Sequence, residues 1–545
     1  MSTEKKVFVR KATGLVREIG FWTATIIVFC NVVGLGWQKR VFQFTGPAIV
    51  PESTYVAGIP PVTMSFLIVG IIVLLTVFMF AVLGAAMPRS GGGYVYISRI
   101  IHPFVGFIAS LVEYFSIAVS YGLIGTAVLE AILIYSWIAG WGTAWATSEV
   151  LLIGGMIIVA FFAGIAYFGA SMTGRILRGM FAIPAAITIL LYGVMLSATP
   201  ASMEAGVKAL TGFSPTQFTQ MALDAGMATS YAGDYWGAMA VATIGTYWAY
   251  IGFAASTFVG GEVKEAGRAL PRTLFVANIL IITLYVTISY ISAHAAMLVG
   301  QVGDYSFFSA YSFLSYGPKG NILPEGVGRA WMPVIAGFNA AGMGMTWFLV
   351  LVPIFAVFWV ANDIPPFILT SSRIIFAMSF DRVLPEKLSE VNERWHSPTM
   401  AIVATMLVAF IGNFAESDIL VKYNVPVLTP YINSGGGVAA TDIWDVIFFL
   451  LASLAGLLFV FRRKDVYEKS AYKPGTAVVA GIGLIAFLSN IYLLYLVGSG
   501  YPVPEPWIFT LFLIVVGAII YYYYRSKGSR VGVDYATIYA EIPPE

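Results

Sequence analysis

The sequence contains very little cysteine, histidine or charge. Cys30 is the single cysteine, and only three histidines occur among the 545 residues. One cysteine can form no intrachain disulfide and no cysteine-based metal cluster, and His102, His294 and His396 are too far apart in sequence to form a zinc or haem motif. Neither a G-x-x-x-x-G-K-S/T phosphate-binding motif nor an H-E-x-x-H motif occurs. We therefore expect neither an ATP-driven pump nor an enzyme, and we predict no cofactor and no metal.

Charged residues are equally scarce. They make up 11% of the chain, against 59% hydrophobic residues, whereas a soluble domain carries about 25% charged residues. A soluble protein of this size could not solvate its surface with so few charges. The composition predicts an all-α polytopic membrane protein in a lipid bilayer, and it excludes a disordered chain or a secreted disulfide scaffold. No nucleic acid partner is expected, and the sequence makes no prediction of the oligomeric state.

Apolar runs of the length that a bilayer requires are abundant. A transmembrane helix needs about 20 predominantly apolar residues. The sequence predicts twelve such helices, at residues 20–44, 62–86, 94–135, 149–171, 176–198, 237–261, 273–298, 346–379, 398–415, 442–461, 475–498 and 506–524.

Basic residues are distributed unevenly between the segments that connect these helices. With the N-terminus inside, twenty-four of the 30 lysines and arginines fall on the cytoplasmic side. The exceptions are Lys39, Arg40, Lys208, Lys319, Arg329 and Lys422. Because positively charged loops stay in the cytoplasm, the distribution predicts that both termini are cytoplasmic, and we expect the plasma membrane as the location.

Two long stretches, 199–236 and 299–345, lie outside the predicted helices and are expected to be extracellular loops. The second stretch contains an apolar piece, Trp331 to Met345. This piece is either a short re-entrant or surface helix, or the outer part of the eighth spanning helix.

The first and sixth predicted helices both contain interruptions. Asn31-Val32-Val33-Gly34-Leu35-Gly36 places a polar residue and two glycines inside a span, and Trp248 to Ser256 places Gly252 among aromatic residues. Glycines alone also serve close helix packing. Interruptions at the first helix of each of two five-helix halves, however, are typical of inverted-repeat transporters. Broken ends expose amides and carbonyls that suit a zwitterion, since amides bind a carboxylate and carbonyls bind an ammonium.

Several motifs carry a resemblance to a known family. They are Met87-Pro88-Arg89-Ser90-Gly91-Gly92-Gly93-Tyr94-Val95-Tyr96, Ala249-Tyr250-Ile251-Gly252-Phe253 with Glu262-Val263-Lys264 and Arg268-Ala269-Leu270-Pro271, and Ser372-Arg373 with Asp381, Leu384-Pro385 and Ser397-Pro398. Through these motifs the chain resembles the amino acid permeases of the amino acid/polyamine/organocation (APC) superfamily.

The resemblance implies the LeuT-type fold, with two inverted five-helix repeats and discontinuous helices 1 and 6. The chain would then consist of a cytoplasmic segment 1–19, repeats at 20–198 and 237–461, helices 11 and 12 at 475–524, and a cytoplasmic tail 525–545. Two departures stand out. The usual G-S/A-G-I-F-like run is replaced by Val33-Gly34-Leu35-Gly36-Trp37, and the lysine that many proton-coupled members carry in helix 5 is missing, because no lysine occurs from 176 to 198.

The interruptions and the resemblance together predict the binding site. The expected substrate-binding residues are Asn31, Val33, Gly34, Leu35, Gly36, Tyr250, Ile251, Gly252, Phe253 and Ala254. In the family an aromatic residue at the break of helix 6 gates the site from outside, and the resemblance implies that Trp248 or Phe253 takes this role.

Acidic residues inside a membrane span are rare and are functional candidates. Asp363 follows Asn362 within helix 8, just before Pro365-Pro366. It is interpreted as a group that takes up a proton or binds a coupling sodium ion during transport, with Asn362 and Ser371 as further residues of this coupling site. The alternative is a structural acid that accepts hydrogen bonds at the proline kink.

The remaining charges inside the spans allow more than one interpretation. Glu113 resembles, together with Tyr114, a pair found in cationic amino acid transporters, and it is assigned to coupling, to the helical core or to a basic substrate. Lys39 and Arg40 either line the outer vestibule or extend to the surface without a role. Glu130 is expected to be solvated.

The function predicted from these features is secondary active transport of amino acids or related amines by alternating access. Proton symport is favoured as the driving force, with sodium symport and exchange as alternatives. Two rival classes are a passive channel, which would not saturate, and a sensor, which would bind amino acids without carrying them.

Overall fold

The computed structural model describes residues 13–229, 231, 233–433, 437–501 and 503–542. Part of the predicted N-terminal segment, residues 1–12, and the last three residues of the predicted tail lie outside this range. Within it the chain is helical, and its few β-bridges are isolated pairs of residues.

Twelve segments of the described chain are long and apolar enough to cross a membrane, which confirms the predicted all-α polytopic class. The spans are Phe21–Gln43, Pro61–Ala86 (α3), Pro103–Ile138 (α5), Ser148–Tyr167 (α6), Gly169–Leu196 (α7), Tyr235–Phe258, Ala266–Met297 (α12), Thr346–Phe380, Thr399–Glu416 (α17), Thr441–Arg462 (α19), Thr476–Ser499 (α21) and Glu505–Arg530 (α22). Three of them contain more than one helix: α1 (Phe21–Val32) is followed by a π-helical turn (Gly36–Arg40) and α2 (Val41–Thr45), α10 (Tyr235–Tyr250) by α11 (Ala255–Phe258), and α15 (Thr346–Leu349) by α16 (Leu351–Phe380).

Shorter helices lie between the spans and after the last one. They are α4 (Gly93–Ile100), α8 (Pro200–Thr211), α9 (Pro215–Asp224), α13 (Phe307–Tyr316), α14 (Met332–Gly342), α18 (Ile419–Lys422), α20 (Lys464–Tyr467) and α23 (Tyr535–Ala540). The predicted third span, 94–135, is therefore two helices, α4 and α5. The division has a local cause: His102 is extended, its Nδ1 accepts a hydrogen bond from the Phe104 amide, and Pro103 begins the next helix because it cannot continue the previous one.

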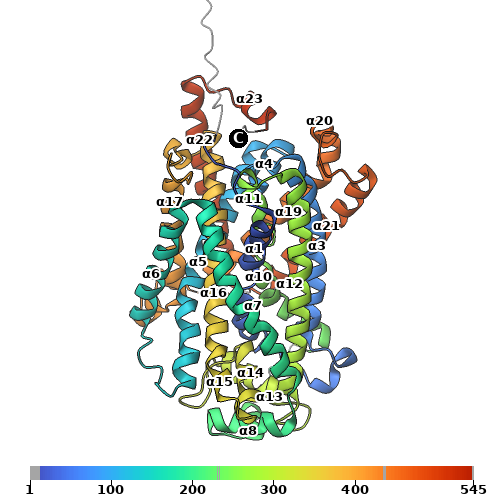
Figure 1. Cartoon of the computed structure of the whole chain (residues 1–545), viewed down its shortest axis with the longest axis vertical. Helices are drawn as coiled ribbons and strands as arrows, with labels where there is room; N and C mark the ends of the chain where they lie inside the picture. Colours follow the sequence, from blue (N-terminus) through green and yellow to red (C-terminus); the bar gives the residue numbers. More distant parts are fainter. Residues whose placement is uncertain (1–12, 230, 232, 434–436, 502, 543–545) are drawn as a thin grey trace, which may run out of the picture.

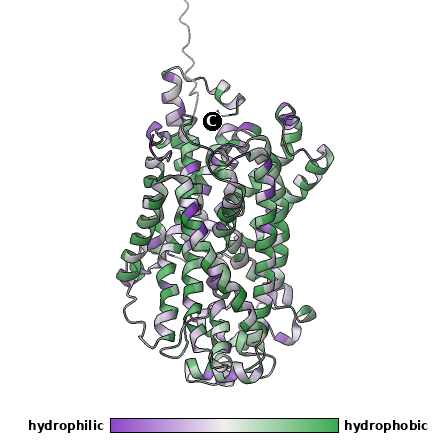
Figure 2. Ribbon diagram, in the orientation of Figure 1, coloured by the Kyte–Doolittle hydropathy of each residue, from purple (hydrophilic) through white to green (hydrophobic). Residues whose placement is uncertain are grey.

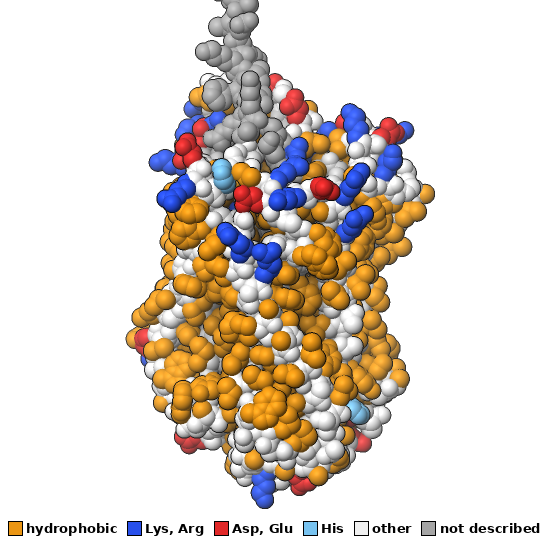
Figure 3. All heavy atoms as spheres, viewed as in Figure 1, with side chains coloured by type: hydrophobic (Ala, Val, Ile, Leu, Met, Phe, Trp, Pro, Cys, Tyr) orange, Lys and Arg blue, Asp and Glu red, His pale blue; other side chains and the backbone are white. Residues whose placement is uncertain are grey.

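The two ends of the bundle differ in charge. We call the end that carries α4, α11, α20 and α23 the basic end, and the end that carries α8, α13 and α14 the loop end (Figure 1). Hydrophobic residues cover the helices between the ends (Figure 2). In the space-filling view blue lysine and arginine side chains gather at the basic end above an apolar band (Figure 3).

The segment that could not be assigned from sequence forms a separate helix. α14 (Met332–Gly342) ends before Gly344, whose φ of 72° separates it from the eighth span. Its residues from Met332 to Ala340 are buried, and it packs against α8 at the loop end (Figure 1). It is therefore a packed element of the loop end and no outer extension of α16.

The interrupted spans occupy the interior. α5 packs against α16, α17 and α19, while α12 packs against α3 and α1. The spans that contain α1 and α10 are mostly buried, whereas α6, α21 and α22 expose most of their surface, as helices that face lipid do. This arrangement places both interruptions in the centre of the bundle.

Candidate functional site

The first interruption lies at Val33 and Gly34. Val33 has a ψ of 84°, which ends α1, and the chain resumes a helical course at Leu35. The freed carbonyl of Gly34 accepts a hydrogen bond of 2.9 Å from the Gln38 side chain. The sequence Val-Gly-Leu-Gly therefore produces a real break, with backbone groups turned away from the helix axis.

The second interruption lies at Ile251 to Ala254. α10 ends at Tyr250, Ile251 has a ψ of 133°, and Gly252 adopts a φ of 97°. Only glycine takes up this left-handed conformation without strain. Both predicted interruptions are present in the structure.

Polar side chains connect the two interruptions directly. The Asn31 amide donates to the Gly252 carbonyl at 3.2 Å. The Tyr285 hydroxyl, from α12, lies 2.6 Å from the Val32 carbonyl and 2.9 Å from the Ala249 carbonyl, and the Asn278 amide donates to Phe253. These contacts satisfy carbonyls that the breaks release, and they couple the position of one broken helix to that of the other.

The tight packing between the breaks predicts a large effect of one methyl group. A Cβ at Gly252 would lie 1.8 Å from Asn31 Nδ2, in a backbone conformation already unfavourable for other residues. We expect Gly252→Ala to lower the free energy of unfolding by about 1–3 kcal/mol. The matched control is Gly179→Ala on α7, where a Cβ meets open space. A thiol-reactive dye measures both unfolding midpoints, because Cys30 is the single cysteine and is buried. Equal midpoints for the two variants would contradict the expected strain.

Asp363, from α16, lies against the first interruption. Its Oδ2 accepts a hydrogen bond of 3.2 Å from the Leu35 amide, and a Cβ at Gly34 would overlap the carboxylate. Only 3% of the residue is exposed, and Oδ1 has no hydrogen-bond partner. The unpaired oxygens of Asn31 Oδ1 and Gln38 Oε1 belong to the same region of the broken helix. Unpaired acceptors beside a buried acid are chemically suited to a proton or a cation.

Two residues predicted with Asp363 have other surroundings. The Asn362 amide points to the Met180 carbonyl on α7, at 3.4 Å. Ser371 donates to the Phe367 carbonyl and accepts from Thr405 on α17. It follows Asp363 by two helical turns, about 12 Å along the axis, so the structure does not bring Ser371 to the break.

The two candidate gating aromatics lie on different sides of the second break. Trp248, on α10, donates from Nε1 to Thr441 Oγ1 at 3.3 Å and packs under the Arg40 guanidinium, 5.3 Å from the ring centroid. Phe253 follows the break and packs against Phe449 on α19 with 4.1 Å between ring centroids. Trp248 therefore belongs to the part of the site that faces the loop end.

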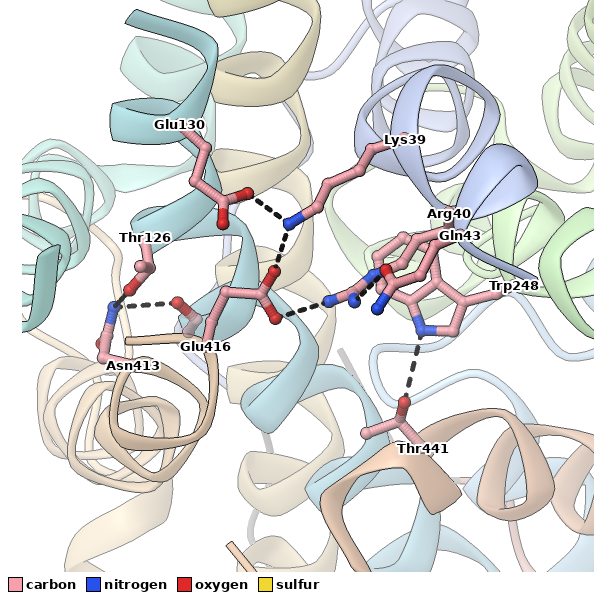
Figure 4. A network of polar contacts seen from close by, with 10 residues as sticks. Lys39, Arg40, Gln43, Thr126, Glu130, Trp248, Asn413, Glu416 and Thr441 are labelled. Carbon is pink, nitrogen blue, oxygen red and sulfur yellow. Dashed lines mark hydrogen bonds and ion pairs between the residues drawn. The ribbon is translucent and has the colours of Figure 1, made fainter. Parts of the chain in front are cut away.

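Lys39 and Arg40 are buried and form ion pairs. Glu416, at the end of α17, binds Lys39 Nζ at 2.8 Å and Arg40 Nη2 at 2.7 Å, and Lys39 also pairs with Glu130 of α5. Figure 4 shows the Glu416 carboxylate between the two cations. Trp248 lies beside Arg40. The expectation that Glu130 is solvated is wrong, and Lys39 and Arg40 do not extend to the surface, because carboxylates inside the protein hold them.

Glu113 of α5 has its partner on α19. It contacts Asp445 of α19, which also accepts a hydrogen bond of 2.5 Å from the Tyr247 hydroxyl. Through Asp445 and Tyr247, Glu113 is thus connected to α10 next to Trp248, one of the two predicted gating residues, and it is not within the predicted substrate-binding segments.

The family motifs form contacts at the basic end. Gly91 has a φ of 93°, and its amide donates to Phe258, the last residue of α11. Arg373 forms two hydrogen bonds with the Glu262 carboxylate, at 2.8 and 3.0 Å. The motifs therefore hold α11, the part of the sixth span nearest the basic end, and Glu262 just after it against Gly91 and α16.

The motif residue Asp381 forms a second ion pair, which lies outside the spans. Arg99 of α4 binds Asp381 through both terminal nitrogens. Burial lowers the pKa of Arg99, but the facing Asp381 carboxylate outweighs it, so that the pKa lies above its usual value. The ring of Tyr539 covers the guanidinium, 4.9 Å from its centre, which attaches α23 to this end.

Sequence reasoning missed several residues of this interior. Tyr285 and Asn278 gave no signal, because nothing separates them in sequence from other polar residues on apolar helices. Asp445 and Glu416 did carry a sequence signal, since an acid within or at the end of a predicted span is unusual. Their partners, however, are far away in sequence.

Twelve spans, with two helix breaks that meet among buried polar side chains, define a polytopic helical membrane protein. A family model described as amino acid permease matches residues 19–519, nearly the whole chain. The chain therefore belongs to this permease family within the APC superfamily, as its motifs predicted, and the family is one of transporters and not of enzymes.

Curated relatives in Bacillus subtilis cover almost the full length. The glutamate/serine transporter AimA is 22% identical over 95% of this chain and 83% of its own. The branched-chain amino acid permease BcaP is 24% identical over 95% of both chains, and the serine/threonine exchanger SteT is 22% identical over 90% of this chain and 96% of its own. Their names cover acidic, polar and aliphatic side chains, so family membership supports amino acid transport without a side-chain class.

Proposed function

We propose that the protein is a secondary active transporter that carries amino acids or related amines across the plasma membrane by alternating access, driven by proton symport. The proposal rests above all on one observation: two interrupted helices meet in the centre of the bundle, with the Asp363 carboxylate at the first break. Such a place offers amides, carbonyls and an acid away from water, which a zwitterion and a proton require.

In this proposal the substrate lies between the segments Asn31–Gly36 and Tyr250–Ala254, which belong to two inverted five-helix repeats. Trp248 gates the site from the extracellular side, since it packs between Arg40 and Thr441 above the second break. Both termini are cytoplasmic, as the distribution of basic residues predicts, and the basic end of Figure 3 is then the cytoplasmic end. Sodium symport and exchange are the alternatives, because the oxygens around Asp363 also suit sodium.

The test is uptake by purified protein in proteoliposomes. A panel of labelled amino acids is supplied with an imposed proton gradient, with a sodium gradient, and without either. We expect saturable uptake of at least one amino acid that an inward proton gradient stimulates. Stimulation by sodium alone would favour the first alternative, and uptake only against a preloaded amino acid would favour exchange. Binding without flux in every arm, or flux that does not saturate, would overturn the proposal.

A further inference from the structure

A second acidic site lies inside the bundle, away from Asp363. Glu113 of α5 and Asp445 of α19 are buried, with 1% and 0% of each residue exposed. Their side chains interact directly. The Tyr247 hydroxyl of α10 donates to Asp445 Oδ2 at 2.5 Å. Three helices that are distant in sequence thus converge on a pair of carboxyl groups.

Each carboxyl group of this pair has one oxygen that lacks a hydrogen-bond donor. Glu113 Oε2 and Asp445 Oδ1 are buried and have no donor. Among the described residues no lysine, arginine or histidine forms an ion pair with either group. Two carboxylates in contact without a cation repel each other strongly in an apolar interior. One proton, bound to one carboxyl and accepted by the other, removes this repulsion and satisfies both oxygens.

The other ionisable groups near the pair do not supply a positive charge. Asp442 of α19 accepts a hydrogen bond of 2.9 Å from the Tyr501 hydroxyl and another from the Ile443 amide. Arg40 of the first span, which packs over Trp248 next to Tyr247, is held by Glu416. The surroundings of the pair are therefore Tyr247, Asp442 and Tyr501, all neutral or negative.

We infer that Glu113 and Asp445 together bind one proton that crosses the membrane with the substrate. The inference rests on the proposed proton symport and adds a site to it. Tyr247 precedes the gating residue Trp248, whose Nε1 donates to Thr441 on the same helix as Asp445. Ser116 of α5 donates to the Thr441 carbonyl at 2.6 Å. The protonated pair and these hydrogen bonds thus hold α5, α10 and α19 together at the outer side of the site.

Release of the proton leaves two adjacent negative charges between α5 and α19. Their repulsion pushes α5 and α19 apart, so the outer side of the site opens more readily when the pair is deprotonated. Uptake of a proton from outside restores the contact and favours closure over the substrate. Tyr247 acts as a positioning residue, because it orients Asp445 towards Glu113.

The experiment compares Glu113→Gln and Asp445→Asn with the wild-type protein. Each amide imitates a carboxyl that is permanently neutral. The controls are Glu204→Gln and Asp304→Asn at exposed positions of the loop end. Uptake is measured in proteoliposomes at acidic and neutral external pH, together with counterflow exchange, which needs no net proton movement. Infrared spectroscopy detects the carbonyl band of a protonated buried carboxyl.

We expect external acid to stimulate the wild type and both controls, while in Glu113→Gln and Asp445→Asn the ratio of acidic to neutral uptake falls to about one with exchange preserved. In the difference spectrum between the wild type and each single variant, the carbonyl band of the pair is expected to be lost, because one proton serves both groups and any band from Asp363 cancels. Variants that keep the band and the stimulation of the wild type would overturn the inference. If wild-type uptake is not stimulated by acid, the proposed symport fails, and the infrared band still decides whether the pair holds a proton.

Tyr247→Phe provides a test that keeps both carboxyl groups. It removes the hydroxyl that stabilises the deprotonated pair, so the pH of half-maximal stimulation is expected to move towards alkaline values. A purely structural tyrosine would change uptake equally at every pH, and that result would contradict its role as a positioning residue.

Discussion

Replacing Asp363 with asparagine is expected to abolish the stimulation of uptake by a proton gradient while the protein still folds. Asparagine has nearly the same shape and keeps an acceptor for the Leu35 amide, which now lies 3.2 Å from Oδ2. It can neither bind and release a proton nor neutralise a cation. We expect gradient-driven uptake to fall at least about tenfold, which corresponds to about 1.4 kcal/mol.

The measurement is gradient-driven uptake against counterflow exchange, with the dye reaction of Cys30 as a check on folding. Asp304→Asn, the same substitution at an exposed loop position, serves as control. If Asp363 only accepts hydrogen bonds at the Pro365-Pro366 kink, Asp363→Asn will retain uptake together with its pH dependence. That result would remove the coupling role and leave a structural one.

Loss of the Glu416 carboxylate is expected to produce the largest change in stability. In Figure 4 this group lies between Lys39 and Arg40, which it binds at 2.8 and 2.7 Å. Among the described residues, Glu416→Gln leaves the two adjacent buried cations with Glu130 as their only carboxylate partner. Removal of one partner from a buried ion pair costs about 3–5 kcal/mol, because the remaining charge stays out of water. We expect a clear fall in the midpoint of thermal unfolding in detergent.

A matched control exists on the surface of the same protein. Glu149 binds Lys422 at 2.6 Å, but both side chains are largely solvated, and surface ion pairs contribute little. Glu149→Gln is therefore expected to leave the unfolding midpoint unchanged. High salt will not reproduce the effect of Glu416→Gln, since buried pairs are screened weakly. A midpoint for Glu416→Gln equal to that of Glu149→Gln would show that the buried pair is dispensable.

The ion pairs of Lys39 and Arg40 with Glu130 and Glu416 also bear on alternating access. Its cations belong to the π-helical turn Gly36–Arg40 of the first span, whereas its anions belong to α5 and α17. If the proposed alternating access moves the first and sixth spans relative to the other helices, these ion pairs must separate for the outer side to open. Glu416→Gln is then expected to raise access from outside as it lowers stability.

The membrane spans and their interruptions were accessible from sequence because they depend on local properties. A span needs about 20 apolar residues wherever it lies in the chain. Most bounds in the structure lie within a few residues of those predicted, although the fifth and seventh spans begin at Gly169 and Ala266 instead of residues 176 and 273. Gly252 in its left-handed conformation and the break after Val32 follow from residues within a few positions. The predicted third span, 94–135, is two helices in the structure, α4 and α5. The division was not predicted, because Pro103 lies within a long apolar run.

Contacts between charged residues were much harder to predict. Asp363 was correctly placed near the first span, because the family resemblance supplied the arrangement of helices. Ser371 was wrongly joined to it, since two helical turns separate their side chains along α16. Glu130 and Glu416 lie on different helices from Lys39, and no local pattern connects the three.

The sequence by itself therefore determined that the protein is a helical membrane permease with interruptions in its first and sixth spans. Only the tertiary structure decided which of the few charges meet: Glu416 with Lys39 and Arg40, and Glu113 with Asp445. The physical reason is the separation along the chain of the residues that determine each property. Hydrophobic length and backbone breaks are properties of short segments, whereas the state of a buried charge depends on whichever group the packed helices place within a few ångströms of it.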